Sequence, residues 1–421
     1  FRGGELLASR VELRTEACEL CLNRCTLTVA SIHGSTRAYG FLCGRDYESP
    51  RPVKREVAGV DFPGMWNRRL KALGAPATRG REQAALGLPA CLHLVDDHLF
   101  WSVFFSELGL PVKSSMPFRK SLELGKLAAG AEFCAPLASM YGHVKYLGET
   151  CSHIFMPVYL QARRRESGKE ENYCYYTQYS ASLAHSLDGQ LQAKLLSPML
   201  DFRKGDLHNA VLLSRSLKVL GLEPGIGKVR RALSLAGAED DRFRREGRKL
   251  FAKAGASGKD APSVVLLGRP YVLMSESLNK GIPDLFRNMG VLTYFQDMLD
   301  LQELRDPALE ALLSKIPWHF AARILRAAAL ICRSPGIYPV LVTAFKCAPD
   351  AFFLSYFEQL MHLHGKPYLV IQIDEHDSNT GYETRIEAAM RSFRNHLVAE
   401  GPDSADGTVD LGGLLPRVDR R

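Results

Sequence analysis

The 421-residue sequence lacks any run of about 20 consecutive apolar residues, so nothing in it predicts a membrane-spanning helix. Its opening residues, FRGGELLASR, lack an initiator methionine and the basic-then-apolar pattern of an export signal. Its 10 cysteines are too dilute for a disulfide scaffold. These absences predict a cytoplasmic protein with reduced thiols available for metals, cut from a longer chain whose N-terminal portion precedes Phe1.

The sequence also lacks a basic stripe interleaved with aromatic residues, the pattern typical of nucleic-acid binding, although its formal net charge is +8. The basic residues are scattered apart from two short runs. QARRRESGK (161–169) is expected to be a loop, and DDRFRREGRK (240–249) the solvated face of a helix. No nucleic-acid partner is therefore expected, and a patch for an acidic protein or a CoA-type phosphate ester is the better alternative.

Apolar runs and amphipathic stretches alternate along most of the chain. Buried strands are expected at 88–94, 153–160, 263–271, 290–295, 338–345 and 367–374, with helical patterns between them. This alternation predicts an α/β fold with parallel sheets covered by helices on both faces. Composition and spacing divide the chain into a four-cysteine segment (1–48), a linker (49–83), a first α/β lobe (84–260), a second α/β lobe (261–398) and a disordered tail (399–421).

The densest group of chemically active residues is the N-terminal cysteine cluster. It comprises Cys18, Cys21 and Cys25 in ACELCLNRC, together with Cys43. Four thiolates at this spacing can enclose a tetrahedral zinc or an iron–sulfur cluster. The alternative is four reduced cysteines that pack a small subdomain. A closed four-cysteine shell leaves no open coordination position, which favours a structural or electron-relay role over substrate chemistry.

Three other cysteines lie at expected junctions between loops and helices. Cys134 and Cys347 are each followed closely by a proline, and Cys174 lies among aromatic and hydroxyl side chains in NYCYYTQY. Loops beyond the carboxyl ends of parallel strands are where open α/β sheets bind ligands. Position alone does not join these three cysteines into one site. The other cysteines of the lobes, Cys91, Cys151 and Cys332, are expected to lie in or near the core.

Several of these segments, in order, carry a family resemblance. They are FWSVFFSELGLPV, FCAPLASMYGHVKYL, IFMPVYL, YCYYTQY, LLGRPYVLMSESLNKGIPDLFRNMGV, FKCAPDAFFLSYFEQL and PYLVIQIDEHDSNTGYETRIEAAMRSF. The sequence resembles the activase-related region of large 2-hydroxyacyl-CoA dehydratase activase proteins. It is similar in turn to the iron–sulfur subunits of 2-hydroxyacyl-CoA dehydratases and to double-cubane cluster proteins. The resemblance covers about residues 84–397, and the N-terminal cysteine segment fits the same large proteins.

This resemblance implies two Rossmann/flavodoxin-like lobes with an oxygen-sensitive [4Fe-4S] cluster in the cleft between them. The implied cluster ligands are Cys134, Cys174 and Cys347, and His143 would either donate a hydrogen bond near the cluster or be a structural histidine. Many relatives carry a further cysteine where this chain has Val158, and FGCGLD where it has FKCAPD. A single cubane is therefore expected rather than a double one.

The function that the resemblance implies is that of a redox protein of anaerobic metabolism. It would accept ATP-driven, low-potential electrons from an activase and use them on a CoA thioester or a similarly difficult substrate. It would act as a 2-hydroxyacyl-CoA dehydratase-like lyase or as a component of a low-potential reductase. The alternative is a non-catalytic electron relay or scaffold that docks the activase ATPase and holds zinc in its N-terminal segment. The ATPase domain is expected on a partner or on a preceding part of the chain, and assembly into a dimer is left open.

Overall fold

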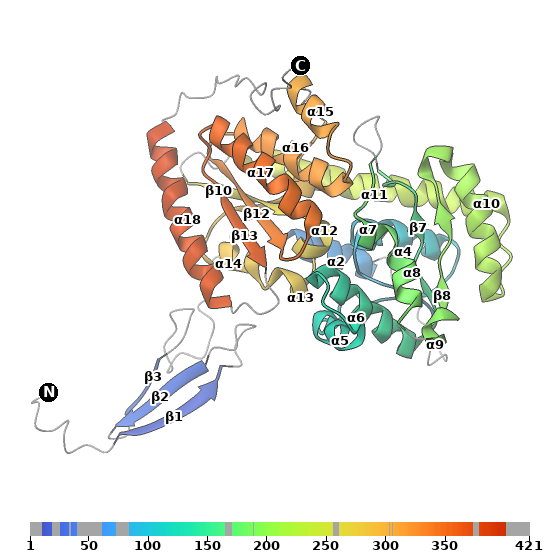
Figure 1. Ribbon diagram of the computed structural model, residues 1–421, viewed down its shortest axis with the longest axis horizontal. Helices are drawn as coiled ribbons and strands as arrows, with labels where there is room; N and C mark the ends of the chain where they lie inside the picture. The colour runs from blue at the N-terminus through green and yellow to red at the C-terminus, as the bar shows by residue number, and fades with distance from the viewer. Residues whose placement is uncertain are drawn as a thin grey trace, which may run out of the picture.

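Parallel sheets form the centre of the protein (Figure 1). The computed structural model describes residues 11–18, 26–32, 35–39, 61–72, 84–164, 171–187, 189–255, 261–302, 304, 306–373 and 379–400. In this part of the chain one sheet has the order β5 (Val112–Ser114), β4 (Ala84–Leu88), β6 (Cys151–Phe155) and β8 (Leu195–Leu196). A second has the order β11 (Thr293–Phe295), β10 (Ser263–Gly268), β12 (Ile337–Ala344) and β13 (Leu369–Ile373). The prediction of an α/β fold with parallel sheets is confirmed.

Both sheets have the same topology. Numbered within its own sheet, each has the strand order 2-1-3-4, which is the order in flavodoxin-like doubly wound folds. Such sheets have a topological switch point, where the connections that follow two neighbouring strands run in opposite directions. Ligands bind at this point, beyond the carboxyl ends of the two strands. That point lies between β4 and β6 in the first sheet and between β10 and β12 in the second.

The strands of the second sheet form because their residues suit burial on both faces. All residues of β10, SVVLLG, are buried, as are those of β12 after Ile337. Helices α16 (His319–Cys332) and α17 (Ala348–Leu363) pack together over this sheet, while α14 (Ile282–Asn288) contacts both β11 and α18 (Asn379–Glu400). Because helices cover the sheet, its strands are buried on both faces, which explains why their sequences are continuously apolar.

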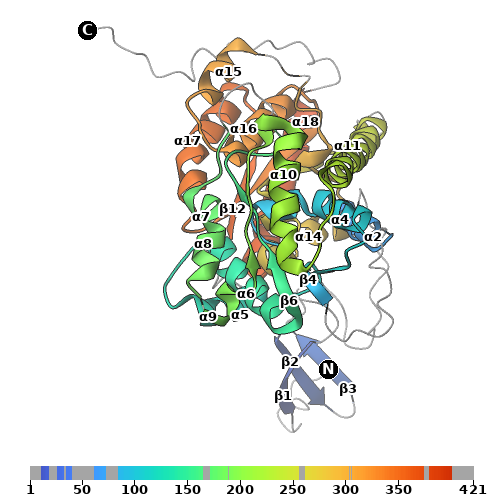
Figure 2. The same ribbon diagram turned by 90° about the vertical axis from the view of Figure 1, so that its right-hand side faces the viewer.

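The helices of the first sheet include a closely packed pair, α5 (Ser121–Ala129) and α6 (Ala135–Thr150). A Cβ on Gly125 would lie 1.7 Å from the carbonyl oxygen of Ala138, and one on Gly142 would lie 1.9 Å from that of Ser121. Glycine therefore allows the two backbones to touch, and the contact fixes the position of α6. On another side of this lobe, the long helix α11 (Ile226–Gly255) packs against α4 (His98–Glu107) and α10 (Gly205–Leu217), as Figure 2 shows.

The remaining elements of the lobes are short. They are α3 (His93–Asp96), β7 (Val158–Tyr159), α7 (Tyr175–Gln178), α8 (Ser180–His185), α9 (Gly189–Gln192), β9 (Met199–Leu200), η1 (Phe202–Lys204), η2 (Lys218–Leu220), α12 (Pro270–Leu273), α13 (Glu276–Asn279), η3 (Gln296–Met298) and α15 (Pro307–Leu313). Strands β7 and β9 pair in parallel as a separate small sheet. One continuous hydrophobic core joins side chains from both large sheets.

The structure differs from the expected strands where prolines interrupt them. The strand expected at 88–94 is wrong, because β4 ends at Leu88, before Pro89, and α3 begins at His93. The strand expected at 153–160 divides into β6 and β7 on either side of Pro157. Proline has no N–H to donate to a strand ladder, which accounts for both endings.

The segment expected to be a linker contains helix α2 (Phe62–Ala72). Its Phe62 and Trp66 are buried, and the Phe62 ring lies 5.5 Å from that of Phe243 and 5.6 Å from that of Phe295. This part of 49–83 is therefore a packed element of the protein, contrary to the expectation. Its apolar residues are too few to stand out from the surrounding Pro, Gly and charged residues.

The N-terminal segment contains an antiparallel sheet of β1 (Glu12–Ala17), β2 (Thr26–Ile32) and β3 (Ser35–Tyr39). Cys18 follows β1 and packs with Leu27 and Val29 in a small core. Among the residues that the structure describes, no helix is both long enough and apolar enough to cross a membrane.

Candidate functional site

Three helices of the two lobes begin directly after a cysteine. Cys134 is the N-cap residue of α6, Cys174 of α7 and Cys347 of α17, and all three have extended backbone angles. A proline in the first turn of α6 and of α17 suits the start of a helix. The backbone N–H groups at a helix N-terminus carry partial positive charge, which reduces the free-energy cost of forming a thiolate there.

The fold brings these three thiols into one neighbourhood. Cys174 is close enough to Cys134 to raise the pKa of the Cys134 thiol electrostatically. Cys134 in turn is close enough to Cys347 to raise the pKa of the Cys347 thiol. Helix α7 lies in the chain between β6 and β8 of the first sheet, whereas α17 follows β12 of the second sheet, and the two helices lie beside each other in Figure 2. The group therefore combines residues that are more than two hundred positions apart in the sequence.

A buried arginine lies beside the three cysteines. Arg269 follows β10 and is 2% exposed. Its Nε donates to Oδ1 of Asp350 at 2.7 Å, and its Nη1 donates to the Tyr271 hydroxyl at 3.0 Å. Burial opposes its charge, but Asp350 holds the pKa of Arg269 well above its usual range. The guanidinium interacts electrostatically with Cys134, Cys174 and Cys347.

Burial governs the protonation of two of the thiols. It raises the pKa of Cys134 to about 11 and raises that of Cys347 still further above its usual range. Arg269 and a backbone N–H near each thiol oppose this rise. At neutral pH these two thiols are therefore protonated, and a metal that binds them must displace their protons.

The three thiols are side chains of the type that ligates iron–sulfur clusters. Among the described residues, no three His, Cys, Asp or Glu side chains converge closely enough to hold one metal ion. In an iron–sulfur cluster each cysteine binds a different iron, so its thiolates lie further apart than the ligands of one ion. Three thiols at helix N-termini, with a buried cation beside them, suit such an anionic group in charge and in ligand type.

His143 lies away from the three cysteines. It is nine positions along α6 from Cys134, which corresponds to about 13 Å along the helix axis. Its ring centroid lies 6.1 Å from that of Phe118. Burial, with a smaller contribution from His98, lowers the pKa of His143 to about 3, so its imidazole is neutral. The structure thus does not bring His143 together with Cys134, Cys174 and Cys347.

The N-terminal cysteine site is only partly described. Cys18 is 7% exposed and lies against Leu27 and Val29. Cys21, Cys25 and Cys43 lie outside the described residues. A metal site formed by these four cysteines therefore stays a prediction.

Exposed aromatic side chains surround the three-cysteine group. Tyr175 and Tyr176 directly follow Cys174, and Phe345 lies two positions before Cys347; all three are exposed. The Tyr176 ring contacts that of Phe133, next to Cys134, at 5.7 Å between centroids. Aromatic surface is therefore exposed close to Cys174 and Cys347 in the chain.

A short parallel bridge holds Cys174 against the second lobe. Asn172 donates its N–H to the carbonyl oxygen of Pro317 at 2.9 Å and accepts the N–H of His319 at 2.8 Å. Next to this bridge the buried Nδ1 of His319 lies 2.5 Å from Oε2 of Glu171. The bridge fixes the chain two residues before Cys174, so the position of this thiol depends on the second lobe.

A buried network of ion pairs joins the same two lobes. It comprises the guanidiniums of Arg163, Arg164, Arg244 and Arg323 and the carboxylates of Asp96, Asp97, Asp240 and Asp297. For example, Arg323 of α16 pairs with Asp96 of α3 at 3.2 Å, and Arg244 of α11 pairs with Asp297 of η3 at 3.1 Å. Burying four charges of each sign is tolerable because every member has a partner.

This network is not apparent from the sequence. The run at 161–169 was expected to be a loop, and its described residues, 161–164, form neither helix nor strand. Arg163 within it is nevertheless only 9% exposed and lies 2.6 Å from Asp97. The run at 240–249 was expected to be a solvated face, which is wrong for Asp240, 2% exposed, and for Arg244. Asp240 and Arg244 are four apart on one helix, a spacing that pairs them but also occurs on exposed helices.

These features define the class of protein: an α/β protein with two doubly wound parallel sheets. Its cysteine and arginine side chains lie together where strands end and helices begin. The family described as "CoA enzyme activase uncharacterised domain" (DUF2229) has a sequence model that matches residues 85–299. The match covers just over half of the chain, and the protein belongs to this family. The predicted relation to an activase-related region is thereby confirmed. No curated protein matches the chain.

Proposed function

We propose that the protein is an iron–sulfur redox protein that works with an ATP-dependent activase in the chemistry of a CoA thioester or a similarly difficult substrate. Two observations support this proposal. The family to which the chain belongs is named for CoA enzyme activases. The observation that carries it is the meeting of Cys134, Cys174 and Cys347 at three helix N-termini beside Arg269.

Cys134, Cys174 and Cys347 would hold a [4Fe-4S] cluster in this proposal. When bound, such a group supplies low-potential, one-electron chemistry. The chain itself supplies the conditions that an anionic group needs in a buried position. The N-terminal N–H groups of α6 and α17 favour thiolate over thiol, and Arg269 contributes a full positive charge that Asp350 holds in place.

The position of the site suits electron transfer from a partner. Cys174 is less buried than Cys134 and Cys347. Its neighbours Tyr175 and Tyr179 are exposed, at 78% and 58%. An activase ATPase that delivers electrons would approach this face, where the distance from protein surface to thiol is smallest.

The experiment is a metal analysis of protein purified without oxygen. Iron and acid-labile sulfide are counted in the wild type and in the variants Cys134→Ser, Cys174→Ser and Cys347→Ser. Cys332→Ser is the matched control, because Cys332 lies at the end of α16, where its sulfur contacts Met361 at 3.9 Å. We expect iron and sulfide in the wild type and the control, and loss of both in the three variants.

Two results would overturn the proposal. One is a wild-type protein that contains zinc and no iron, which would favour a scaffold with a structural metal in its N-terminal segment. The other is an iron content that the three substitutions leave equal to that of the Cys332→Ser control.

A further inference from the structure

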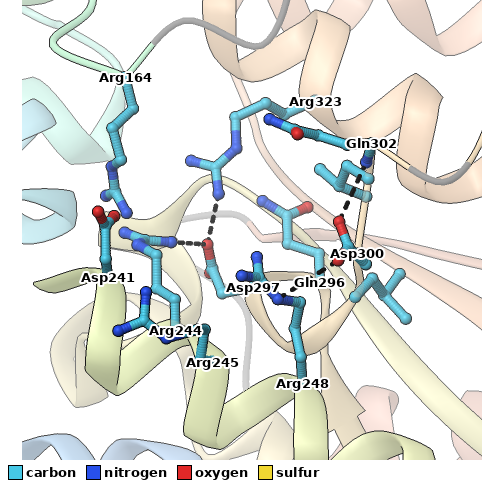
Figure 3. Close-up of a pocket in the computed structure, with 12 residues that line it drawn as sticks. Arg164, Asp241, Arg244, Arg245, Arg248, Gln296, Asp297, Asp300, Gln302 and Arg323 are labelled. Carbon is cyan, nitrogen blue, oxygen red and sulfur yellow. Dashed lines mark hydrogen bonds and ion pairs between the residues drawn. The ribbon is translucent and has the colours of Figure 1, made fainter.

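A cavity of ≈370 Å³ lies beyond the carboxyl end of β11, and Figure 3 shows the side chains that line it. In the sheet, β11 is on the opposite side of β10 from β12, the strand that precedes Cys347. Side chains from four parts of the chain line it, one of which is the segment after β11, from Gln296 to Gln302. Arg164 follows β7, Arg244, Arg245 and Arg248 come from α11, and Arg323 comes from α16. The cavity lies at the carboxyl-end edge of the second sheet, beside β11 rather than at the switch point between β10 and β12.

The inner wall of this cavity is rigid. Arg323 Nη2 donates to Oδ1 of Asp297 at 2.5 Å, and Arg244 Nη1 donates to the same oxygen at 3.1 Å. Behind them, Asp96 accepts from Arg244 at 3.0 Å. The guanidiniums are therefore held in fixed orientations before any ligand enters, which reduces the entropy that binding would cost.

A buried amide nitrogen in the wall has no hydrogen-bond partner among the residues that the structure describes. Gln296 is fully buried, and its Oε1 accepts the N–H of Gly268 at 3.2 Å. Because Gly268 offers a donor there, the amide oxygen must face it and the NH2 group must face the other way. In the part of the chain that the structure describes, the Nε2 of Gln296 has no hydrogen-bond partner. In Figure 3 the amide lies between Arg323 and Arg248, at the cavity.

The outer wall carries cations that the buried network does not use. Arg245 is exposed and makes no ion pair with the described residues, and Arg248 makes a 3.5 Å ion pair with Asp300. Five guanidiniums and three carboxylates line the cavity, and the inner guanidiniums also pair with Asp96 and Asp240 behind the wall. The amide donor of Gln296 and the exposed guanidinium of Arg245 are therefore the groups that suit a ligand rich in acceptor oxygens.

We propose that this cavity binds the diphosphate group of a small phosphorylated ligand. Guanidiniums match phosphate oxygens in a two-pronged geometry, and the side-chain N–H2 of Gln296 supplies a further donor at the inner end. The volume accommodates a diphosphate and part of the group attached to it. Nucleotides and CoA share this chemistry. The proposal does not depend on the three-cysteine site, because it uses none of those residues.

Calorimetric titration of the full chain, in metal-free buffer, tests the proposal with pyrophosphate, ADP and CoA as probes. The double variant Arg245→Ala/Arg248→Ala removes both outer cations. Arg242→Ala is the matched control, because Arg242 lies on the same helix but pairs with Glu239 and does not line the cavity. We expect at least one probe to bind, with affinity roughly tenfold weaker for each outer guanidinium removed and unchanged in the control.

The relative affinities of the probes assign the source of the diphosphate. Tighter binding of ADP than of CoA indicates a nucleotide, and the reverse order indicates a CoA ester. The proposal is overturned if all three probes bind more weakly than about 1 mM, or if the double variant binds them as well as the Arg242→Ala control does. Because the assay needs no iron, its outcome and that of the metal analysis are independent.

Discussion

The buried pair of Arg269 and Asp350 gives a prediction that can be worked out from the structure. The guanidinium is 2% and the carboxylate 5% exposed, and Nη2 of Arg269 lies 2.6 Å from Oδ1 of Asp350. Removing one partner leaves the other as an uncompensated buried charge, which costs about 3–5 kcal/mol. A typical domain is stable by only about 5–15 kcal/mol, so either single substitution should be strongly destabilising.

Replacing both partners gives a different expectation. An apolar pair of similar volume is often neutral relative to a buried ion pair. Arg269→Met combined with Asp350→Leu should therefore cost less than the two single substitutions together. The double-mutant cycle should return a coupling free energy of about 3 kcal/mol.

The assay is equilibrium urea unfolding of metal-free, reduced protein, followed by tryptophan fluorescence and circular dichroism. The matched control is the cycle for Arg119 and Glu276, whose side chains are 63% and 47% exposed at a distance of 2.8 Å. That exposed pair should show a coupling below about 1 kcal/mol. A coupling for Arg269 and Asp350 as small as that of the control would refute the argument that Arg269 is a fixed, buried cation beside the cysteines.

Three further predictions concern the scaffold and its pH dependence. Gly142→Ala should destabilise the protein by about 1–3 kcal/mol or more, because its Cβ would meet the Ser121 carbonyl oxygen at 1.9 Å. Gly227→Ala, where a Cβ meets nothing within 4 Å, should instead raise the free energy of unfolding by about 0.5–1 kcal/mol, and equal urea midpoints for the two variants would contradict the close contact of α5 and α6. Burial would raise the pKa of Asp96, but Arg164 and Arg323 lower it from 3.8 to about 2, so its contribution of about 2 kcal/mol should be present above pH 4 and lost as the pH falls towards 2. Unfolding curves of wild type and Asp96→Asn should converge over that range, and a constant difference down to pH 2 would disprove the shift.

Much of the fold could be predicted because its strands are apolar and regularly spaced. Runs such as SVVLLG in β10 and YPVLVTA in β12 are buried on both faces, so their composition alone indicates covered parallel strands. The errors arose where a single proline ended an apolar run, at Pro89 and Pro157. Helix α2 escaped prediction because its buried residues Phe62 and Trp66 stand in a stretch rich in Pro, Gly and charged residues.

The candidate sites were less accessible to sequence reasoning. Cys134, Cys174 and Cys347 were grouped through family resemblance, since no local spacing relates residues that different segments bring together. The ion-pair network was missed because Arg163 and Asp240 look like ordinary surface charges in the sequence. Only the packing of α11 across the two lobes turns them into buried partners.

The most direct test of the central claim is the iron content of Cys347→Ser compared with that of Cys134→Ser. Cys347 belongs to the second sheet and lies outside residues 85–299, whereas Cys134 lies within them. If one cluster is held between the lobes, both variants purified without oxygen should lose iron and sulfide to the same extent. An iron content in Cys347→Ser equal to that of the wild type would contradict the claim.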